Sequence, residues 1–113
     1  MKLIESINFD VVINSLICDP QIPLILGGYY TFIEACDTKV DGKLIKKAIH
    51  YKISETNSKR VTFNLICSIY DYYQIHGTLP SKKNLKHIHM HELKSRPCNY
   101  SVACGIVRRL IEK

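Results

Sequence analysis

The sequence predicts an all-α protein made of five to six short helices. Apolar residues recur at the i, i+3, i+4 spacing of a helix face in several segments, and no sustained period-2 alternation of apolar and polar residues appears. Proline and glycine punctuate these segments at Asp19-Pro20, Gly77 and Arg96-Pro97, where helices are expected to stop. A length of 113 residues, with 46% apolar and 23% charged residues, is typical of one globular domain.

The first half of the chain is expected to hold two or three helices. The first helix carries the apolar positions Phe9, Val12, Ile13, Leu16 and Ile17 and ends at Asp19-Pro20. Residues 29–36, after the Gly27-Gly28 pair, predict a short buried helix, with a strand as the alternative. Residues 37–42 form a polar turn, and Asp41 is expected to cap a further helix. That helix has the apolar stripe Leu44, Ile45, Ala48, Ile49 and Ile53, with Lys43, Lys46, Lys47 and Lys52 outside it.

The loop at residues 56–58 is interpreted as the boundary between two segments of one compact domain. Residues 1–56 would be a helical scaffold or dimerisation segment, and residues 57–113 would hold three helices at about 60–76, 81–93 and 99–112. Gly77 suits the end of the first of these helices, and Ser81 suits the start of the second.

Positive charge is concentrated in the second segment. Residues 57–113 hold ten Lys/Arg against three Asp/Glu, a formal +7, whereas residues 1–56 hold six against seven, a formal −1; the sum is the +6 of the chain. Such asymmetry favours a polyanionic partner, of which nucleic acid is the commonest.

Three helices in a basic segment predict a helix-turn-helix, in which the last helix would read base edges. The sequence Gly77-Thr78-Leu79-Pro80-Ser81, followed by Leu85, Val102-Ala103 and Arg108-Arg109-Leu110, resembles the winged helix-turn-helix of GntR-type bacterial regulators. The resemblance covers residues 62–113 and does not include a wing. It implies DNA binding through the last helix.

The expected DNA contacts fall into two groups. Asn99, Tyr100 and Ser101 would face base edges at the start of the last helix, and basic side chains around them would hold phosphates. The complete expected set is Lys82, Lys83, Lys86, Lys94, Arg96, Asn99, Tyr100, Ser101, Arg108 and Arg109.

The sequence gives little support for metal binding or catalysis. His87 and His91 share a helix face, but a structural zinc site needs four ligands, so no metal is expected. Residues 37–42 resemble the start of a calcium-binding EF-hand loop, but Lys39 and Ala48 occupy positions where calcium needs oxygen ligands. Catalytic signatures are missing, so we expect neither an enzyme nor a cofactor. Five widely spaced cysteines suggest reduced thiols used as small core residues.

The sequence therefore favours a small, sequence-specific DNA-binding transcriptional regulator. Its partners would be double-stranded DNA and a second copy of the chain in a homodimer, because one recognition helix contacts few base pairs. No apolar run reaches the roughly 20 residues of a membrane span, so a cytoplasmic location is expected. The alternative is an adaptor or inhibitor that docks its basic face on an acidic protein partner.

Overall fold

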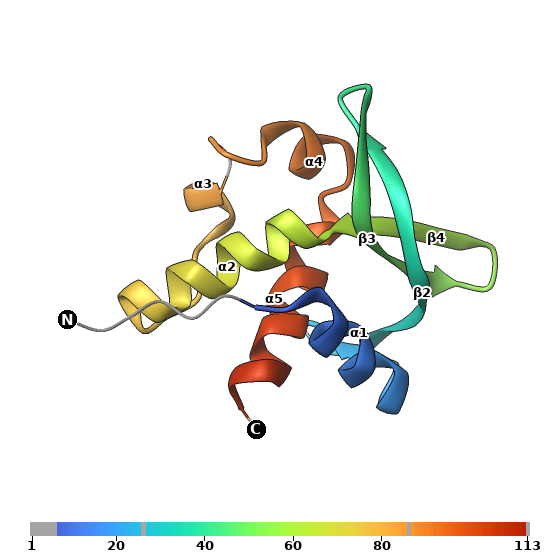
Figure 1. Cartoon of the computed structure of the whole chain (residues 1–113), viewed down its shortest axis with the longest axis horizontal. Helices are drawn as coiled ribbons and strands as arrows, with labels where there is room; N and C mark the ends of the chain where they lie inside the picture. The colour runs from blue at the N-terminus through green and yellow to red at the C-terminus, as the bar shows by residue number, and fades with distance from the viewer. Residues whose placement is uncertain (1–6, 26, 86, 113) are drawn as a thin grey trace.

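The chain folds as α+β. A computed structural model describes residues 7–25, 27–85 and 87–112 (Figure 1). The elements in order are α1 (Phe9–Cys18), β1 (Gln21–Pro23), β2 (Tyr29–Val40), β3 (Lys43–Ser54), β4 (Asn57–Thr62), α2 (Phe63–His76), α3 (Lys82–Leu85), α4 (Met90–Ser95) and α5 (Cys98–Ile111). The four strands form one antiparallel meander in the order β1-β2-β3-β4, and the sheet curls into a half-barrel.

The all-α prediction is therefore wrong, and the error lies in residues 21–62. The alternative interpretation of residues 29–36 as a strand is confirmed, because they belong to β2. The helix expected after Asp41 is instead β3, which pairs with β2 on one side and with β4 on the other. Asp41 and Gly42 do not cap a helix: they have φ angles of 53° and 76° and join Val40 to Lys43 in a tight hairpin turn. β3 and β4 also pair across the boundary expected near residue 56.

The expected helices at either end of the chain are largely confirmed. Asn8 caps α1 by accepting a hydrogen bond from the Asp10 amide, and the helix ends before Asp19. Thr62 caps α2, which ends at Gly77 in the left-handed conformation that glycine favours. The helix expected at 81–93 is two shorter ones, α3 and α4.

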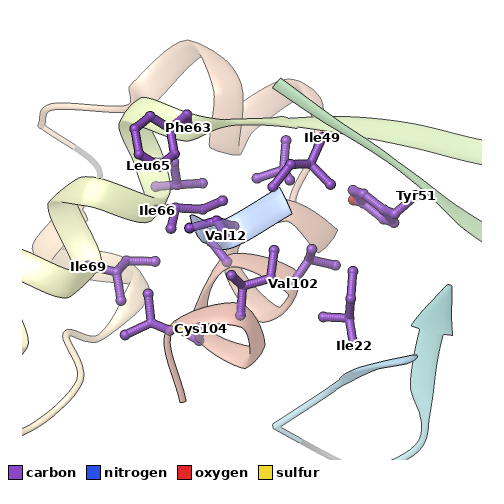
Figure 2. Close-up of a cluster of buried hydrophobic side chains, with 14 of the residues drawn as sticks. Val12, Ile22, Ile49, Tyr51, Phe63, Leu65, Ile66, Ile69, Val102 and Cys104 are labelled. Carbon is purple, nitrogen blue, oxygen red and sulfur yellow. The ribbon is translucent and has the colours of Figure 1, made fainter. Parts of the chain in front are cut away.

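One hydrophobic core lies between the sheet and the helices, which include α3 through Leu85 and α4 through Leu93 (Figure 2). The strands contribute Ile22, Ile49, Tyr51 and Val61, all fully buried. They face side chains of α1, α2 and α5, namely Val12, Leu16, Leu65, Ile66, Ile69, Val102, Ile106 and Val107. Tyr51 stacks on Tyr30 with ring centroids 5.7 Å apart.

Helix α5 is a core helix and not a recognition helix. Every residue from Val102 to Val107 is buried, so the helix is enclosed on all sides over its middle turns. Gly105 lies so close to β1 that a Cβ there would overlap the carbonyl oxygen of Pro23. The winged helix-turn-helix prediction is therefore wrong, since its reading helix would have to lie on the surface.

The cysteines only partly follow the expected core role. All five are free thiols; Cys104 is buried, Cys18 is exposed, and Cys36, Cys67 and Cys98 are half-buried. Burial raises the pKa of the Cys104 thiol to about 11.

In the described part of the chain, no helix is long and apolar enough to cross a membrane.

Candidate nucleic-acid interface

The largest group of exposed cations lies on the β2–β3 hairpin. Lys39, Lys43, Lys46 and Lys47 are exposed around the Asp41-Gly42 turn. The hairpin reaches past the rest of the sheet at the top of Figure 1. None of the four lysines takes part in a salt bridge within the described ranges. Their charge is therefore free to attract an anion.

A second group of cations lies on α3 and α4. Lys82 is half-buried, and Lys83 and Lys94 are exposed. Lys82 and Lys94 border a groove that also includes His87, Met90, Leu93 and Pro97. Lys86, also expected to contact DNA, lies outside the described residues.

A close side-chain contact between His91 and Asp41 connects the two groups. His91 Nε2 in α4 lies 3.4 Å from a carboxylate oxygen of Asp41 in the hairpin turn, with both side chains more than half exposed. The hairpin tip and α4 therefore lie side by side (Figure 1).

Asn99 lies in the interior, where its side chain is fully engaged. Its Oδ1 accepts from the Tyr51 hydroxyl at 2.6 Å, and its Nδ2 donates to Glu92 Oε2 at 2.8 Å and to the Arg60 carbonyl at 2.9 Å. Glu92 is 3% exposed and accepts from the Thr62 amide at 2.9 Å and from the Thr62 hydroxyl at 2.5 Å. This network fastens the junction of α4 and α5 to the outer edge of β4.

Arg96 joins two strands of the curled sheet. Its Nη1 donates to the Arg60 carbonyl at 2.8 Å and to Thr38 Oγ1 at 3.1 Å, and its Nη2 donates to the Lys39 carbonyl at 2.9 Å. The guanidinium thus spans from β4 to β2 and makes three hydrogen bonds inside the molecule.

The other residues of the last helix that were expected to contact DNA also make contacts within the molecule or are half-buried. The Arg109 guanidinium donates to the carbonyls of Ser15, Asp19 and Gln21, which fixes the end of α1 to α5. The Tyr100 hydroxyl donates to the Pro80 carbonyl at 2.8 Å. Arg108 pairs with Glu112 at 3.5 Å, and Ser101 is half-buried.

A cleft of about 490 Å³ with mixed polar and apolar walls lies between the hairpin, α2 and α4, lined by Val40, Ile45, Thr62, Asn64, Cys67, Ser68, Asp71, Ile88, His89, His91 and Glu92. In it, Ser68 Oγ and His89 Nε2 share a hydrogen bond of 2.8 Å. Burial lowers the pKa of His89, while the nearby Glu92 carboxylate acts in the opposite direction.

A serine beside a neutral histidine is the start of a nucleophile–base pair, but acyl transfer also needs free donors for the oxyanion. Ser68 lies inside α2, where backbone N–H groups are committed to the helix. We therefore interpret this hydrogen bond as fixing the segment before α4 onto α2.

The three alternating histidines diverge. His87 borders the α3–α4 groove, His89 contacts Ser68, and His91 pairs with Asp41. Among the residues that the structure describes, no cluster of three or more His, Cys, Asp or Glu side chains could hold a metal ion.

Sequence reasoning missed the hairpin lysines, although a signal for them was present. Residues 38–52 hold five lysines and one acidic residue, a local +4 that counting by halves conceals behind acidic residues elsewhere. The Asp41-Gly42 dipeptide among these lysines is a strong hairpin signal.

Comparison with protein-family models, with curated proteins and with solved structures found no match to this chain.

Proposed function

We propose that the chain binds double-stranded DNA through the tip of the β2–β3 hairpin. The observation that carries the proposal is the set of four exposed lysines, without ion-pair partners among the described residues, on a projecting two-stranded ribbon. The major groove of DNA is about 12 Å wide and admits such a ribbon as readily as a helix.

The hairpin would supply mainly phosphate contacts. Lysine ammonium groups neutralise phosphates and release condensed counterions, which gives affinity with little dependence on sequence. Lys83 and Lys94 lie on the neighbouring helices and extend the cationic surface beyond the hairpin. The resulting complex would be strongly salt-dependent.

A salt titration tests this proposal. Binding of a short fluorescent duplex is measured between about 50 and 200 mM salt, where each phosphate contact contributes a slope of about −0.9 in log K against log salt. Lys46→Ala should make the slope less steep by about 0.9. The matched control is Lys52→Ala, which removes the same residue type from the same strand at its other end, where Lys52 is paired with Glu55.

Two results would overturn the proposal. One is the absence of duplex binding at the lowest salt, which would leave the basic surface to an acidic protein partner. The other is an equal change of slope in Lys46→Ala and Lys52→Ala, which would show that net charge alone governs binding and that the hairpin tip has no special place in it.

A further inference from the structure

The groove between α3 and α4 combines an apolar lining with a cationic border. Its volume is about 830 Å³, and its lining residues are Lys82, His87, Met90, Leu93, Lys94 and Pro97. This volume lies in the range of about 300–1,000 Å³ typical of small-ligand sites. The groove is thus large enough to hold one nucleotide-sized group.

Apart from the buried Leu93, the side chains of this groove are not part of the buried core. Met90 is 54% exposed although it lies beside the buried Leu93. Lys82 and Lys94 form no salt bridge within the described part of the chain, and none of the lining residues is acidic. A complementary ligand would have a flat apolar part next to an anionic group.

We propose that this groove binds an unpaired nucleotide of a nucleic-acid strand. The base would lie against Met90 and Pro97, since a polarisable thioether makes favourable contacts with aromatic rings. The flanking phosphates would lie near Lys82 and Lys94, where each contact releases counterions. The groove would therefore favour single-stranded segments over fully paired ones.

The position of the groove links it to the hairpin. The α4 helix forms one wall of the groove and also contacts the hairpin turn through the His91–Asp41 pair. In Figure 1, α4 lies between α3 and the hairpin tip. A duplex on the hairpin could therefore send a single-stranded tail across α4 into the groove. A preference for a duplex with a single-stranded tail over a blunt duplex rests on the proposed function. Binding of a nucleotide in the groove can be measured separately.

The experiment compares a blunt duplex, the same duplex with a single-stranded thymidine tail, and the tail alone. For the wild type we expect the tailed duplex to bind more tightly than the blunt one by about two- to tenfold, the size of one contact between a thioether and an aromatic ring. Met90→Ala should abolish this preference while leaving blunt-duplex affinity unchanged. Ile88→Ala is the matched control, since Ile88 is 72% exposed, apolar and outside the groove lining.

A photocross-link supplies a direct readout. A tail carrying 4-thiothymidine should cross-link to the segment 87–97, and Met90→Ala should reduce the yield while Ile88→Ala does not. Cross-linking confined to other segments would overturn the proposal.

The outcomes separate the two proposals. Equal, salt-dependent binding of blunt and tailed duplexes would refute the groove and leave the hairpin intact. Binding of the tail alone, without any binding of the blunt duplex, would refute the hairpin and support the groove. A tail preference that survives in Met90→Ala would also refute the groove.

Discussion

At the residue scale, Asn99 connects three parts of the molecule. Its carboxamide joins the Tyr51 hydroxyl of β3, the Glu92 carboxylate of α4 and the Arg60 carbonyl of β4. Two of these partners lie where water cannot easily replace a missing hydrogen bond, because Tyr51 is fully buried and Glu92 is 3% exposed. The side chain is therefore needed for the fold.

Asn99→Ala should lower the free energy of unfolding by at least about 2 kcal/mol, since it strands buried polar groups at roughly 1–3 kcal/mol each. Urea denaturation measures the loss. Ser101→Ala, two residues further along α5 and half-buried, is the control and should change stability by less than about 0.5 kcal/mol. An Asn99→Ala protein of unchanged stability that has lost DNA binding would instead support a base-reading role.

His89 should make the protein less stable in mild acid. Burial holds the pKa of His89 below its ordinary value of 6.5, so below pH 6.5 the unfolded chain binds more protons at this residue than the folded one does. Stability should therefore fall as the pH drops through this value toward the lower pKa of the folded state. His89→Gln should show a shallower fall between about pH 7 and pH 5 by urea denaturation. A steeper fall in the variant would contradict the assignment of this acid sensitivity to the burial of His89.

The roles of these residues could not be predicted from the sequence. A polar residue at the start of a basic, amphipathic helix has the same local pattern whether it faces DNA or a strand edge. Whether the residue faces DNA or a strand edge depends on β4. This strand contains only six residues, and its sequence has no clear alternation of apolar and polar residues. Asn99 and Arg96 were expected to contact DNA, and the structure shows that their side chains hold elements of the fold together.

At the scale of elements, the β2–β3 hairpin explains why the predicted fold class failed. Leu44, Ile45, Ala48, Ile49 and Ile53 satisfy the spacing of a helix face, although β3 also buries Ile49 and Tyr51 at the spacing of a strand. Register shifts between Cys36 and Thr38 and between Lys52 and Ser54 disturb the period-2 pattern. The helices at either end have no such irregularity, and their positions could be predicted closely.

The packing of α5 on β1 depends on one missing side chain. Gly105→Ala should destabilise the protein by about 1–3 kcal/mol, because the new methyl group meets the backbone of Pro23 and must push the strand away. In an open helix position the same change would stabilise by about 1 kcal/mol. The change in the free energy of unfolding therefore has opposite signs for a close-packed and an open position, and thermal or urea unfolding measures it. An increase in stability would show that α5 and β1 do not pack this closely.

At the scale of the whole molecule, charge and burial are distributed unevenly. The core elements α5 and the middle of β3 are buried, whereas the hairpin tip is exposed. Composition assigned the basic surface to residues 57–113, whereas the four exposed lysines of the hairpin tip belong to residues 1–56. Counting charged residues along the sequence gives the net charge of a segment but does not show where these residues lie on the folded surface.

Amide hydrogen exchange should follow this distribution. Residues 102–107 and the amides of Ile49 and Tyr51 should exchange slowest, because they open only when the core opens, and residues 40–46 should exchange faster. Addition of duplex DNA should slow exchange in residues 40–46 specifically. Protection confined to α5, with none at the hairpin, would argue against the proposed interface.

The junction of α4 and α5 also affects how the protein behaves at high concentration. The outer edge of β4 presents the Arg60 carbonyl and the Thr62 amide, and Asn99, Arg96 and Glu92 occupy them. An uncovered strand edge is a template on which another chain can add a strand, and this is how many proteins begin to aggregate. In this protein, side chains stand in for the missing neighbour strand. The junction of α4 and α5 therefore shields this strand edge, and its detachment would leave the Arg60 carbonyl and the Thr62 amide open to pairing with another chain.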